Sequence, residues 1–293
     1  MMGAPDAARD FEPHRRHLVG LAYRMLGSMA EAEDVVQEAY LRWHRTDRAA
    51  VANPRAFLSK TVTRLCLDTL KSARARRESY VGPWLPEPVL DAESLAADTA
   101  SDYAHDLSVA LMLALERLSP LERAAFLLHD VFDMDFAEIG EALGRNAAAC
   151  RQLAARARDH VRAARPRFPV SAEDGRKVVA AFIAASESGD AEGLARLLAE
   201  GAVLYTDGGG KRIAALNPIF GRARIVRFLT SVRRKQQFHP VVGVRPAEVN
   251  GLPGFIAVEI DGALQTVALD VRDGAIATIY IVRNPDKLQR VAM

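Results

Sequence analysis

The chain has little of what would assign it to an oxidising compartment, a membrane or a metal site. It carries only two cysteines, Cys66 and Cys150, in separate segments and without the Cys-x-x-Cys spacing of zinc and redox sites. A disulfide framework and a zinc site are therefore not expected. No apolar run approaches the length that spans a bilayer, and the first residues lack the charged-then-apolar plan of a secretion signal. We expect a cytoplasmic protein without a metal or cofactor.

A strong charge imbalance is also absent, because the formal net charge of the 293 residues is only +2. The total therefore does not indicate a nucleic-acid partner, but the distribution does. Seven Lys or Arg and one acid lie between Arg55 and Arg77, and seven Arg and one acid lie between Arg145 and Arg167. Two such basic clusters are typical of nucleic-acid contact. The length and the ordinary globular composition predict about two domains.

Residues 28–43 are predicted to form an amphipathic helix with an acidic outer face. Ser28 and Glu31 have the spacing of a capping box, which favours a helix start at this point. The apolar stripe at helical spacing consists of Val36, Ala39, Tyr40 and Trp43. Asp34, Glu38 and Leu41 fall on the opposite face. Such a face repels nucleic acid and suits a protein partner.

The first half of the chain is otherwise predicted to be helical, after a loose tail over residues 1–10. Further helices are expected over residues 11–26, 54–77, 107–118, from 120 onward, 135–143 and 146–165, with a loop over 44–53. Gly144-Arg145 joins the last two helices, and Asn146 is a good N-cap for the final basic helix. A short helix, a tight turn and a basic helix are typical of a helix-turn-helix that reads DNA.

Two motifs resemble bacterial sigma factors of the extracytoplasmic-function type. AEDVVQEAYLRW, residues 32–43, is similar to their region 2, and LGRNAAACRQLAARARDHV, residues 143–161, is similar to their region 4.2. The resemblance covers residues 11–165. It implies that the acidic helix binds core RNA polymerase, that the first basic segment captures the −10 promoter element, and that the final basic helix reads the −35 element.

The expected site residues follow from these faces and from that resemblance. The core-polymerase contacts are Asp34, Gln37, Glu38 and Leu41. The −10 contacts are Asn53, Lys60, Arg64, Lys71, Arg74, Arg76 and Arg77. The −35 contacts are Asn146, Arg151, Gln152, Arg156 and Arg158. Family members commonly have Arg-Asn where this chain has Thr63-Arg64, so the base preference at −10 is left open.

A proline-rich linker over residues 79–106 separates the two sigma-like regions. Its WLPEP motif, residues 84–88, places Trp84 among prolines that favour an extended chain. An exposed Trp there is poorly solvated, so we expect it either to pack on another part of the chain or to be buried locally. The linker is otherwise acidic.

The last 120 or so residues are predicted to form a separate α+β domain. Helices are expected over 173–188 and 223–235, with a short helix between them that ends at 199. Strands are expected over 203–206, 254–260, 263–270 and 275–282. Asp261-Gly262 and Asp273-Gly274 are the expected hairpin turns. Helices followed by a curved sheet resemble SnoaL-like members of the nuclear-transport-factor-two-like fold. The expected fold is therefore multidomain, with two all-α sigma domains, the second a helix-turn-helix, and a C-terminal α+β cone domain.

Three motifs resemble a sigma subgroup in which a fused C-terminal domain regulates activity in place of a separate anti-sigma factor. The motifs are WLPEP, DGGGK (residues 207–211) and NPDKL (residues 284–288). The expected regulatory contacts are Trp84, Leu85, Pro86, Glu87, Pro88, Asp207, Gly208, Gly209, Gly210, Lys211, Asn284, Pro285, Asp286, Lys287 and Leu288. Lys211 or Lys287 could face the acidic linker. The expected domains are residues 1–78, the linker 79–106, residues 107–168 and residues 169–293.

Two other classes of function stay open on the sequence. The first is a one-component regulator, in which the helix-turn-helix is coupled to a pocket that binds a small molecule. The second is an enzyme with accessory DNA-binding helices, whose acid–base candidates are Tyr205, Asp207, His239 and Asp270. These four have no diagnostic spacing, and DGGGK lacks the spacing of a phosphate loop. A sigma factor that is not an enzyme and binds core RNA polymerase and promoter DNA is the preferred interpretation.

Overall fold

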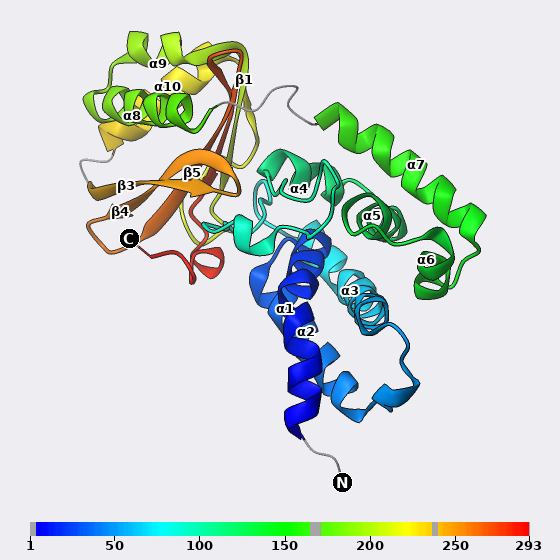
Figure 1. Ribbon diagram of the computed structural model, residues 1–293. Coiled ribbons are helices and arrows are strands. Elements are labelled where there is room, and N and C mark those ends of the chain that lie inside the picture. The colour runs from blue at the N-terminus through cyan, green and yellow to red at the C-terminus, as the bar shows by residue number, and fades with distance from the viewer. Residues whose placement is uncertain (1–3, 165–170, 236–239, 293) are drawn as a thin grey trace. The chain divides into compact units, whose positions relative to one another are not determined.

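The computed structural model describes residues 4–164, 171–235 and 240–292, with the side chains of residues 4–6, 72–78, 163–164 and 233–235 outside the description. The chain folds into two compact units (Figure 1). The helical unit combines Met1–Glu78 with Ala92–Arg165, and the sheet unit combines Ser79–Asp91 with Pro166–Met293. The first part of the predicted linker therefore belongs to the sheet unit. No helix within the described residues is long and apolar enough to cross a membrane.

Three long helices form the first part of the helical unit: α1 (Ala4–Leu26), α2 (Met29–Arg45) and α3 (Pro54–Glu78). The amide of Glu31 donates to the Ser28 hydroxyl at 3.3 Å, so α2 begins at the predicted cap. The prediction of a loose tail is wrong, because α1 begins at Ala4. Ala7 and Phe11 are buried, and these apolar contacts stabilise the first turns.

Four further α-helices complete the helical unit: α4 (Val109–Glu116), α5 (Pro120–Phe126), α6 (Phe136–Leu143) and α7 (Ala147–Ala164). The capping box at Ser119 and Glu122 forms as predicted. Gly144 ends α6 with a φ of 64°, a conformation that favours glycine. The helix-turn-helix of α6 and α7 is therefore present. The guanidinium of Arg24 on α1 is fully buried and donates to the carbonyls of Leu95 and Ala104, which holds residues 95–104 against α1.

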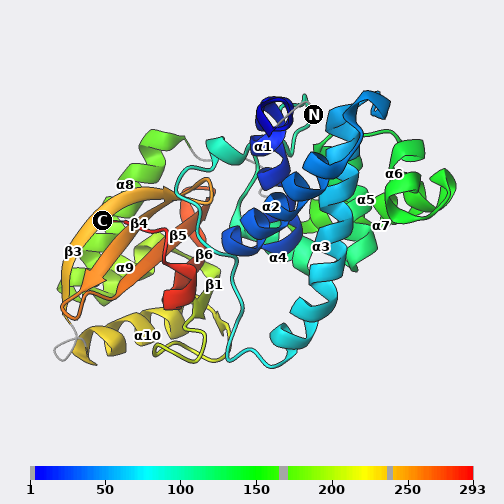
Figure 2. The ribbon, with the colours of Figure 1, turned by 90° about the horizontal axis from the view of Figure 1, so that it is seen from below.

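The sheet unit is a six-stranded sheet with helices on one face (Figure 2). The helices are α8 (Ala172–Ser188), α9 (Ala191–Leu197) and α10 (Arg222–Lys235). The strands are β1 (Leu198–Asp207), β2 (Ile219–Phe220), β3 (Val241–Val249), β4 (Leu252–Glu259), β5 (Leu264–Arg272) and β6 (Ala275–Val282). Their order is β2-β1-β6-β5-β4-β3, so β4 to β6 form the predicted antiparallel meander and β3 extends it by one edge strand.

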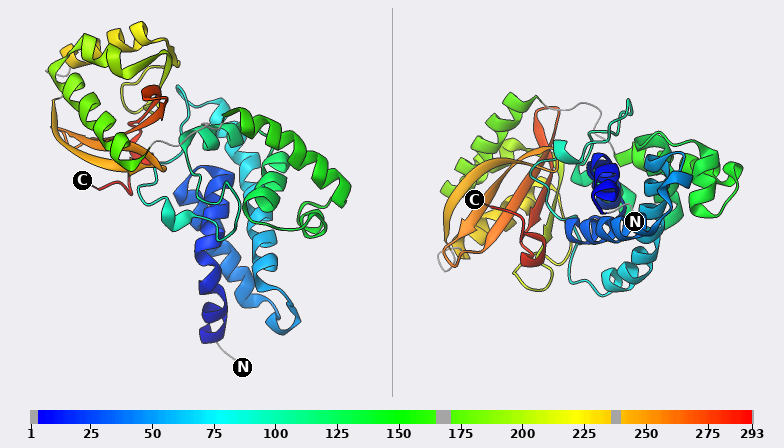
Figure 3. Two further views of the ribbon diagram at one scale, coloured as in Figure 1. Left: turned by 45° about the horizontal axis from the view of Figure 1, so that its top comes forward. Right: turned by 60° about the horizontal axis from the view of Figure 1, so that its bottom comes forward.

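The parallel pairing of β1 with β6 was not predicted, and it brings two of the sequence motifs together. Thr206 lies beside Ile281 and Asp207 beside Val282 at the ends of these two strands. Parallel strands end at the same edge of a sheet. The segments that follow β1 and β6, which carry DGGGK and NPDKL, therefore leave the sheet side by side. The curvature of the sheet around its helices is visible in Figure 3.

The core of the sheet unit lies between this sheet and its helices. Phe182 on α8 and Ile225 on α10 face strand residues such as Phe255 and Leu269, and all four are buried. The other face of the sheet also carries buried side chains, among them Ile256 and Tyr280.

Candidate nucleic-acid interface

The α2 helix presents the predicted acidic face. Asp34, Gln37 and Glu38 are exposed, and Leu41 is an exposed large apolar residue at 43%. The opposite face is buried through Ala32, Val35, Val36, Ala39 and Trp43. Glu38 pairs with Arg42 at 2.9 Å on the surface. The outer face of this helix therefore presents carboxylates and one exposed leucine that are not part of the core.

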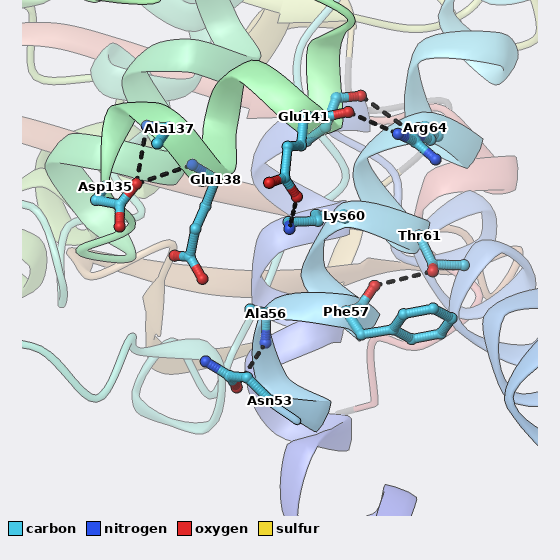
Figure 4. Close-up of polar contacts among 11 residues, drawn as sticks. Asn53, Ala56, Phe57, Lys60, Thr61, Arg64, Asp135, Ala137, Glu138 and Glu141 are labelled. Atoms are coloured by element: carbon cyan, nitrogen blue, oxygen red, sulfur yellow. Dashed lines mark hydrogen bonds and ion pairs between the residues drawn. The ribbon is translucent and has the colours of Figure 1, made fainter. Parts of the chain in front are cut away.

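The basic face of α3 contacts the C-terminal end of α6 (Figure 4). The ammonium of Lys60 pairs with Glu141 at 2.5 Å. The guanidinium of Arg64 donates to the carbonyl of Glu141 at 2.6 Å and to that of Ala142 at 3.1 Å. These carbonyls belong to the last turn of α6, where carbonyls lack partners in the helix and the helix dipole is negative. Two predicted DNA-binding cations therefore bind the negative end of another helix.

The other predicted −10 residues have different surroundings. The Asn53 side chain accepts from the amide of Ala56 at 3.1 Å and caps α3. Lys71 is exposed and pairs with Asp68 at 2.7 Å. The side chains of Arg74, Arg76 and Arg77 lie outside the described residues.

On the helix-turn-helix, the predicted −35 residues divide into exposed and paired side chains. Asn146 caps α7 by accepting from the amide of Ala149 at 2.8 Å. Arg151 and Gln152 are exposed, and the Arg151 guanidinium lies over the Phe136 ring at 5.4 Å. Exposed Arg and Gln can make paired hydrogen bonds to guanine and adenine.

Two arginines of α7 are held by acids of the same unit. Arg156 pairs with Glu122 at 3.1 Å and stays largely exposed. Arg158 pairs with Asp130 at 2.5 Å, and only 28% of its side chain is exposed. The sequence placed Arg158 on the outer face of α7, but it lies at the margin, where it reaches back to the body of the unit.

In the sheet unit, the three motifs WLPEP, DGGGK and NPDKL meet at the side chain of Asp207, which is fully buried. We call this group the Asp207 clasp. The hydroxyl of Tyr80 and the ammonium of Lys287 donate to the carboxylate at 2.5 Å and 2.7 Å. The amides of Leu85 and Gly209 donate to it at 2.9 Å and 3.1 Å. One carboxylate thus joins the linker, the DGGGK turn and the segment after β6.

Aromatic and amide side chains of the linker and the tail complete the clasp. The Lys287 ammonium lies 4.4 Å from the centre of the Trp84 ring and 4.8 Å from that of Tyr80, within range of cation–π attraction. The Asn284 amide donates to the Tyr80 hydroxyl at 2.8 Å. Burial, with the adjacent Asp207 carboxylate, raises the pKa of Tyr80. Tyr80 therefore stays a neutral donor to Asp207.

Glycine is required where the DGGGK turn approaches the tail. Gly209 has a φ of +59°, and a Cβ there would lie 2.3 Å from the Asn284 side chain. Lys211 pairs with Asp286 at 2.6 Å, so it does not face the acidic part of the linker. Lys287 does reach the linker, through the carbonyl of Leu85. Within WLPEP, Trp84 is half-buried, and Leu85, Pro86, Glu87 and Pro88 are buried.

The linker is also held further along, where residues 87–89 meet the tail and a hairpin turn. The buried Glu87 pairs with Arg290 at 3.3 Å. Val89 exchanges two hydrogen bonds with Asn250, one from each residue's backbone amide. Pro285 and Leu288 bound a short 3-10 turn that Asn284 caps. The three motifs were expected from the sequence, whereas Tyr80, Asn250 and Arg290 were not.

The acid–base candidates of the sheet unit are engaged in structural contacts. Asp207 belongs to the clasp. Asp270 is buried and pairs with Arg272 at 2.7 Å, and Tyr205 stacks on Tyr280 with ring centres 5.7 Å apart. His239 lies outside the described residues.

Comparison with known proteins shows the family of the chain. The family model for Sigma-70 region 2 matches residues 11–76, and that for Sigma-70 region 4 matches residues 108–161. The chain is 42% identical to the ECF RNA polymerase sigma factor SigJ of Mycobacterium tuberculosis, over 95% of this chain and 92% of the relative. A probable ECF sigma factor, SigI, of the same species is 33% identical over 94% and 92%.

A crystal structure of M. tuberculosis SigJ superposes with a TM-score of 0.74 at 37% identity, covering 96% of this chain and 98% of that one. The expected fold class, with two helical sigma regions and a C-terminal α+β domain, is confirmed. The chain belongs to the extracytoplasmic-function sigma factors, which direct RNA polymerase to promoters.

Proposed function

We propose that the sigma factor binds core RNA polymerase through the exposed face of α2 formed by Asp34, Gln37, Glu38 and Leu41. The observation that carries this assignment is the separation of the two faces of α2, since the core is built from the opposite side. Carboxylates around one exposed leucine suit a basic protein surface with an apolar pocket. A rim of charge sets the association rate and specificity, and the leucine adds buried apolar area.

The test is a pull-down of core RNA polymerase by the full chain carrying Asp34→Lys and Glu38→Lys. We expect loss of binding with unchanged helix content, because both side chains point away from the buried stripe. Asp68→Lys on α3 is the matched control, since it reverses one exposed carboxylate of the same unit and should leave binding intact. Wild-type affinity in the double variant would contradict the assignment.

For promoter DNA, we propose that residues 1–78 capture the −10 element and residues 107–168 read the −35 element. The −10 contacts are Asn53, Lys60, Arg64, Lys71, Arg74, Arg76 and Arg77, and the −35 contacts are Asn146, Arg151, Gln152, Arg156 and Arg158. Lys60 and Arg64 cannot bind α6 and a phosphate with the same donors. Capture of the −10 strand by these donors therefore competes with the contact between α3 and α6.

We further propose that the domain over residues 169–293 modulates this activity through the linker. The observation that supports it is the buried Asp207, which accepts two hydrogen bonds from linker residues Tyr80 and Leu85. The linker joins the −10 and −35 regions, so any change in the clasp changes the tether between them. Such modulation does not need catalysis. The contacts of the acid–base candidates Tyr205, Asp207 and Asp270 support a structural role for these residues. A small-molecule ligand of this domain stays a prediction, as does a cytoplasmic location, which action on RNA polymerase favours.

A further inference from the structure

We propose that α10 of the C-terminal domain is an additional DNA-binding surface, which contacts the phosphate backbone of double-stranded promoter DNA. The first observation is in the sequence. Residues 208–247 contain nine Lys or Arg, seven of them Arg, and no Asp or Glu. This acid-free stretch lies outside both regions to which sigma activity is assigned, in a chain whose formal net charge is only +2.

The fold divides these cations into paired and unpaired groups. In the loop before β2, Lys211 pairs with Asp286 and Arg212 with Asp261. On α10, Arg222, Arg224 and Arg227 are exposed and form no ion pair or side-chain hydrogen bond with any described residue. The helix continues through Arg233, Arg234 and Lys235 in sequence. Three arginines without an acidic partner among the described residues therefore lie on one helix, whereas Arg245 on β3 donates to the carbonyl of Ala292.

The structure also fixes which way α10 faces. Ile225 is fully buried in the core, and Val226, Phe228 and Leu229 pack against it. At 100° per residue, Arg224 and Arg227 lie on the opposite side of the helix. In Figure 1, α10 lies with α8 and α9 in the helical layer of its unit. The arginines are thus carried by a rigid element whose apolar face is already occupied.

The position of these arginines lowers the stability of the helix when no anion is bound. Arg222 and Arg224 lie in the first turn, which contains no acid. That end of a helix carries a partial positive charge, so each cation there destabilises it, by roughly 0.3–1 kcal/mol. The helices before it have the reverse arrangement, with Glu173 and Asp174 in the first turn of α8 and Glu192 in that of α9. A bound polyanion would offset the cost on α10.

Duplex DNA is the occupant that fits this chemistry. Arginine forks match phosphate oxygens in paired hydrogen bonds. The α10 helix carries no Asn or Gln, and arginines that bind phosphates carry no sequence information. Promoter DNA is also held by the same polypeptide, at high effective concentration. This last step rests on the proposed promoter contacts of the two sigma regions.

The test compares full-length variants as holoenzymes with core RNA polymerase on duplex promoter DNA. One variant carries Arg222→Ala, Arg224→Ala and Arg227→Ala. The matched control carries Arg176→Ala, Lys177→Ala and Arg196→Ala, which removes equal charge from α8 and α9, where acids accompany the cations. Affinity is measured across a range of salt. The α10 variant should bind more weakly, with a slope of log K against log salt reduced by about 2–3, at about 0.9 per lost phosphate contact.

The control should keep the wild-type slope. The loss in the α10 variant should be equal on a duplex of scrambled sequence, because phosphates carry no sequence information. Alanine is a strong helix former, so unchanged thermal unfolding is expected and excludes misfolding. A wild-type slope, a loss confined to the promoter sequence, or loss of core-polymerase affinity without DNA would each overturn the proposal. Failure of the wild-type holoenzyme to bind the promoter would instead contradict the proposed function.

Discussion

At the scale of single residues, the carboxylate of Asp207 is the strongest candidate for a residue that decides stability. It is fully buried and compensates the ammonium of Lys287, which is itself 12% exposed. Asp207→Ala leaves that cation and three further donors without their acceptor. We expect a loss of about 3–5 kcal/mol in the unfolding free energy of the sheet unit, as for other broken buried pairs.

The measurement is urea unfolding followed by fluorescence in a Trp43→Phe background, where Trp84 beside the clasp is the single tryptophan. Asp286→Ala is the control, since its pair with Lys211 is more than half exposed and should be worth at most about 1 kcal/mol. Equal losses in the two variants would refute the assigned role of Asp207.

A second residue-scale prediction concerns His17 on α1. Its ring bonds Ser59 at 2.9 Å and lies edge-on to Phe132 at 4.7 Å. Burial, with nearby cations that include Arg55, lowers the pKa of His17 to about 3. Between pH 6.5 and about 3 the unfolded chain therefore binds a proton that the folded chain does not. Stability should fall as pH falls through this window, by at most about 1.4 kcal/mol per pH unit from this group.

Unfolding free energies of the wild type and His17→Gln across this window provide the check. The destabilisation caused by His17→Gln should shrink as pH falls. A pH-independent effect of His17→Gln would rule out this linkage.

At the scale of elements, the contact of α3 with α6 places two of the proposed DNA-binding cations in competition with a helix end. Glu141→Lys should repel Lys60 and favour separation of the two helices. The Lys60–Glu141 pair has one exposed partner, so its loss is worth about 0.5–1 kcal/mol. We expect about two- to fivefold tighter binding of a single-stranded −10 oligonucleotide by the free sigma factor.

Fluorescence anisotropy with labelled −10 oligonucleotide measures this change. The control for nonspecific attraction of DNA is Glu138→Lys, which reverses a charge on the same helix. Glu138 forms no ion pair within the described residues. Equal gains in both variants would attribute the effect to net charge alone.

Element prediction from the sequence succeeded where local chemistry determines structure. Ser28, Ser119 and Gly144 are found at the predicted helix ends, because caps act within one turn. Strands β2 and β3 were missed. The first has two residues, and the second is an edge strand that contains Gly243 and Pro246 and lacks apolar alternation. The turn Asn250-Gly251, with positive φ at both residues, was a usable hairpin signal.

The motifs that form the candidate sites could be predicted from the sequence, but the residues with which their side chains pair could not. Faces of α2 and α7 follow from helical period, so their exposed residues were found. The pairing of Lys287 with Asp207 follows from the parallel register of β1 and β6, which no local pattern encodes. The exposure of Arg158 was misjudged for a similar reason, since Arg158 pairs with Asp130, which lies in residues 127–131 directly after α5.

At the scale of the whole molecule, removal of the C-terminal domain should release the linker. Cutting the chain after Pro169 removes Asp207 and Lys287, whereas deleting Asn284–Met293 removes Lys287 and Asn284 and keeps Asp207. Both truncations should make the linker sensitive to chymotrypsin at Tyr80 and Trp84, and the intact chain should resist. Limited proteolysis with mass spectrometry reads these sites directly.

In vitro transcription with matched concentrations of holoenzyme adds the functional readout. We expect the two truncations to differ in promoter output, because the shorter deletion keeps the β1 contacts of the linker and the longer one removes them all. Equal output from the full chain, both truncations and Trp84→Ala would mean that the domain is a passenger. The proposal that the clasp regulates the sigma regions would then be wrong.

The order of the clasp along the chain has a consequence for synthesis on the ribosome. Tyr80 meets Asp207 across 127 residues and Asn284 across 204. At roughly 5–20 residues per second, the last partner leaves the ribosome about 10–40 seconds after the linker. The sigma regions therefore emerge and can fold while the linker between them is still unclasped. Each newly made molecule passes through a period in which the restraint on its linker does not yet exist, so the first polymerase encounters can occur before regulation begins.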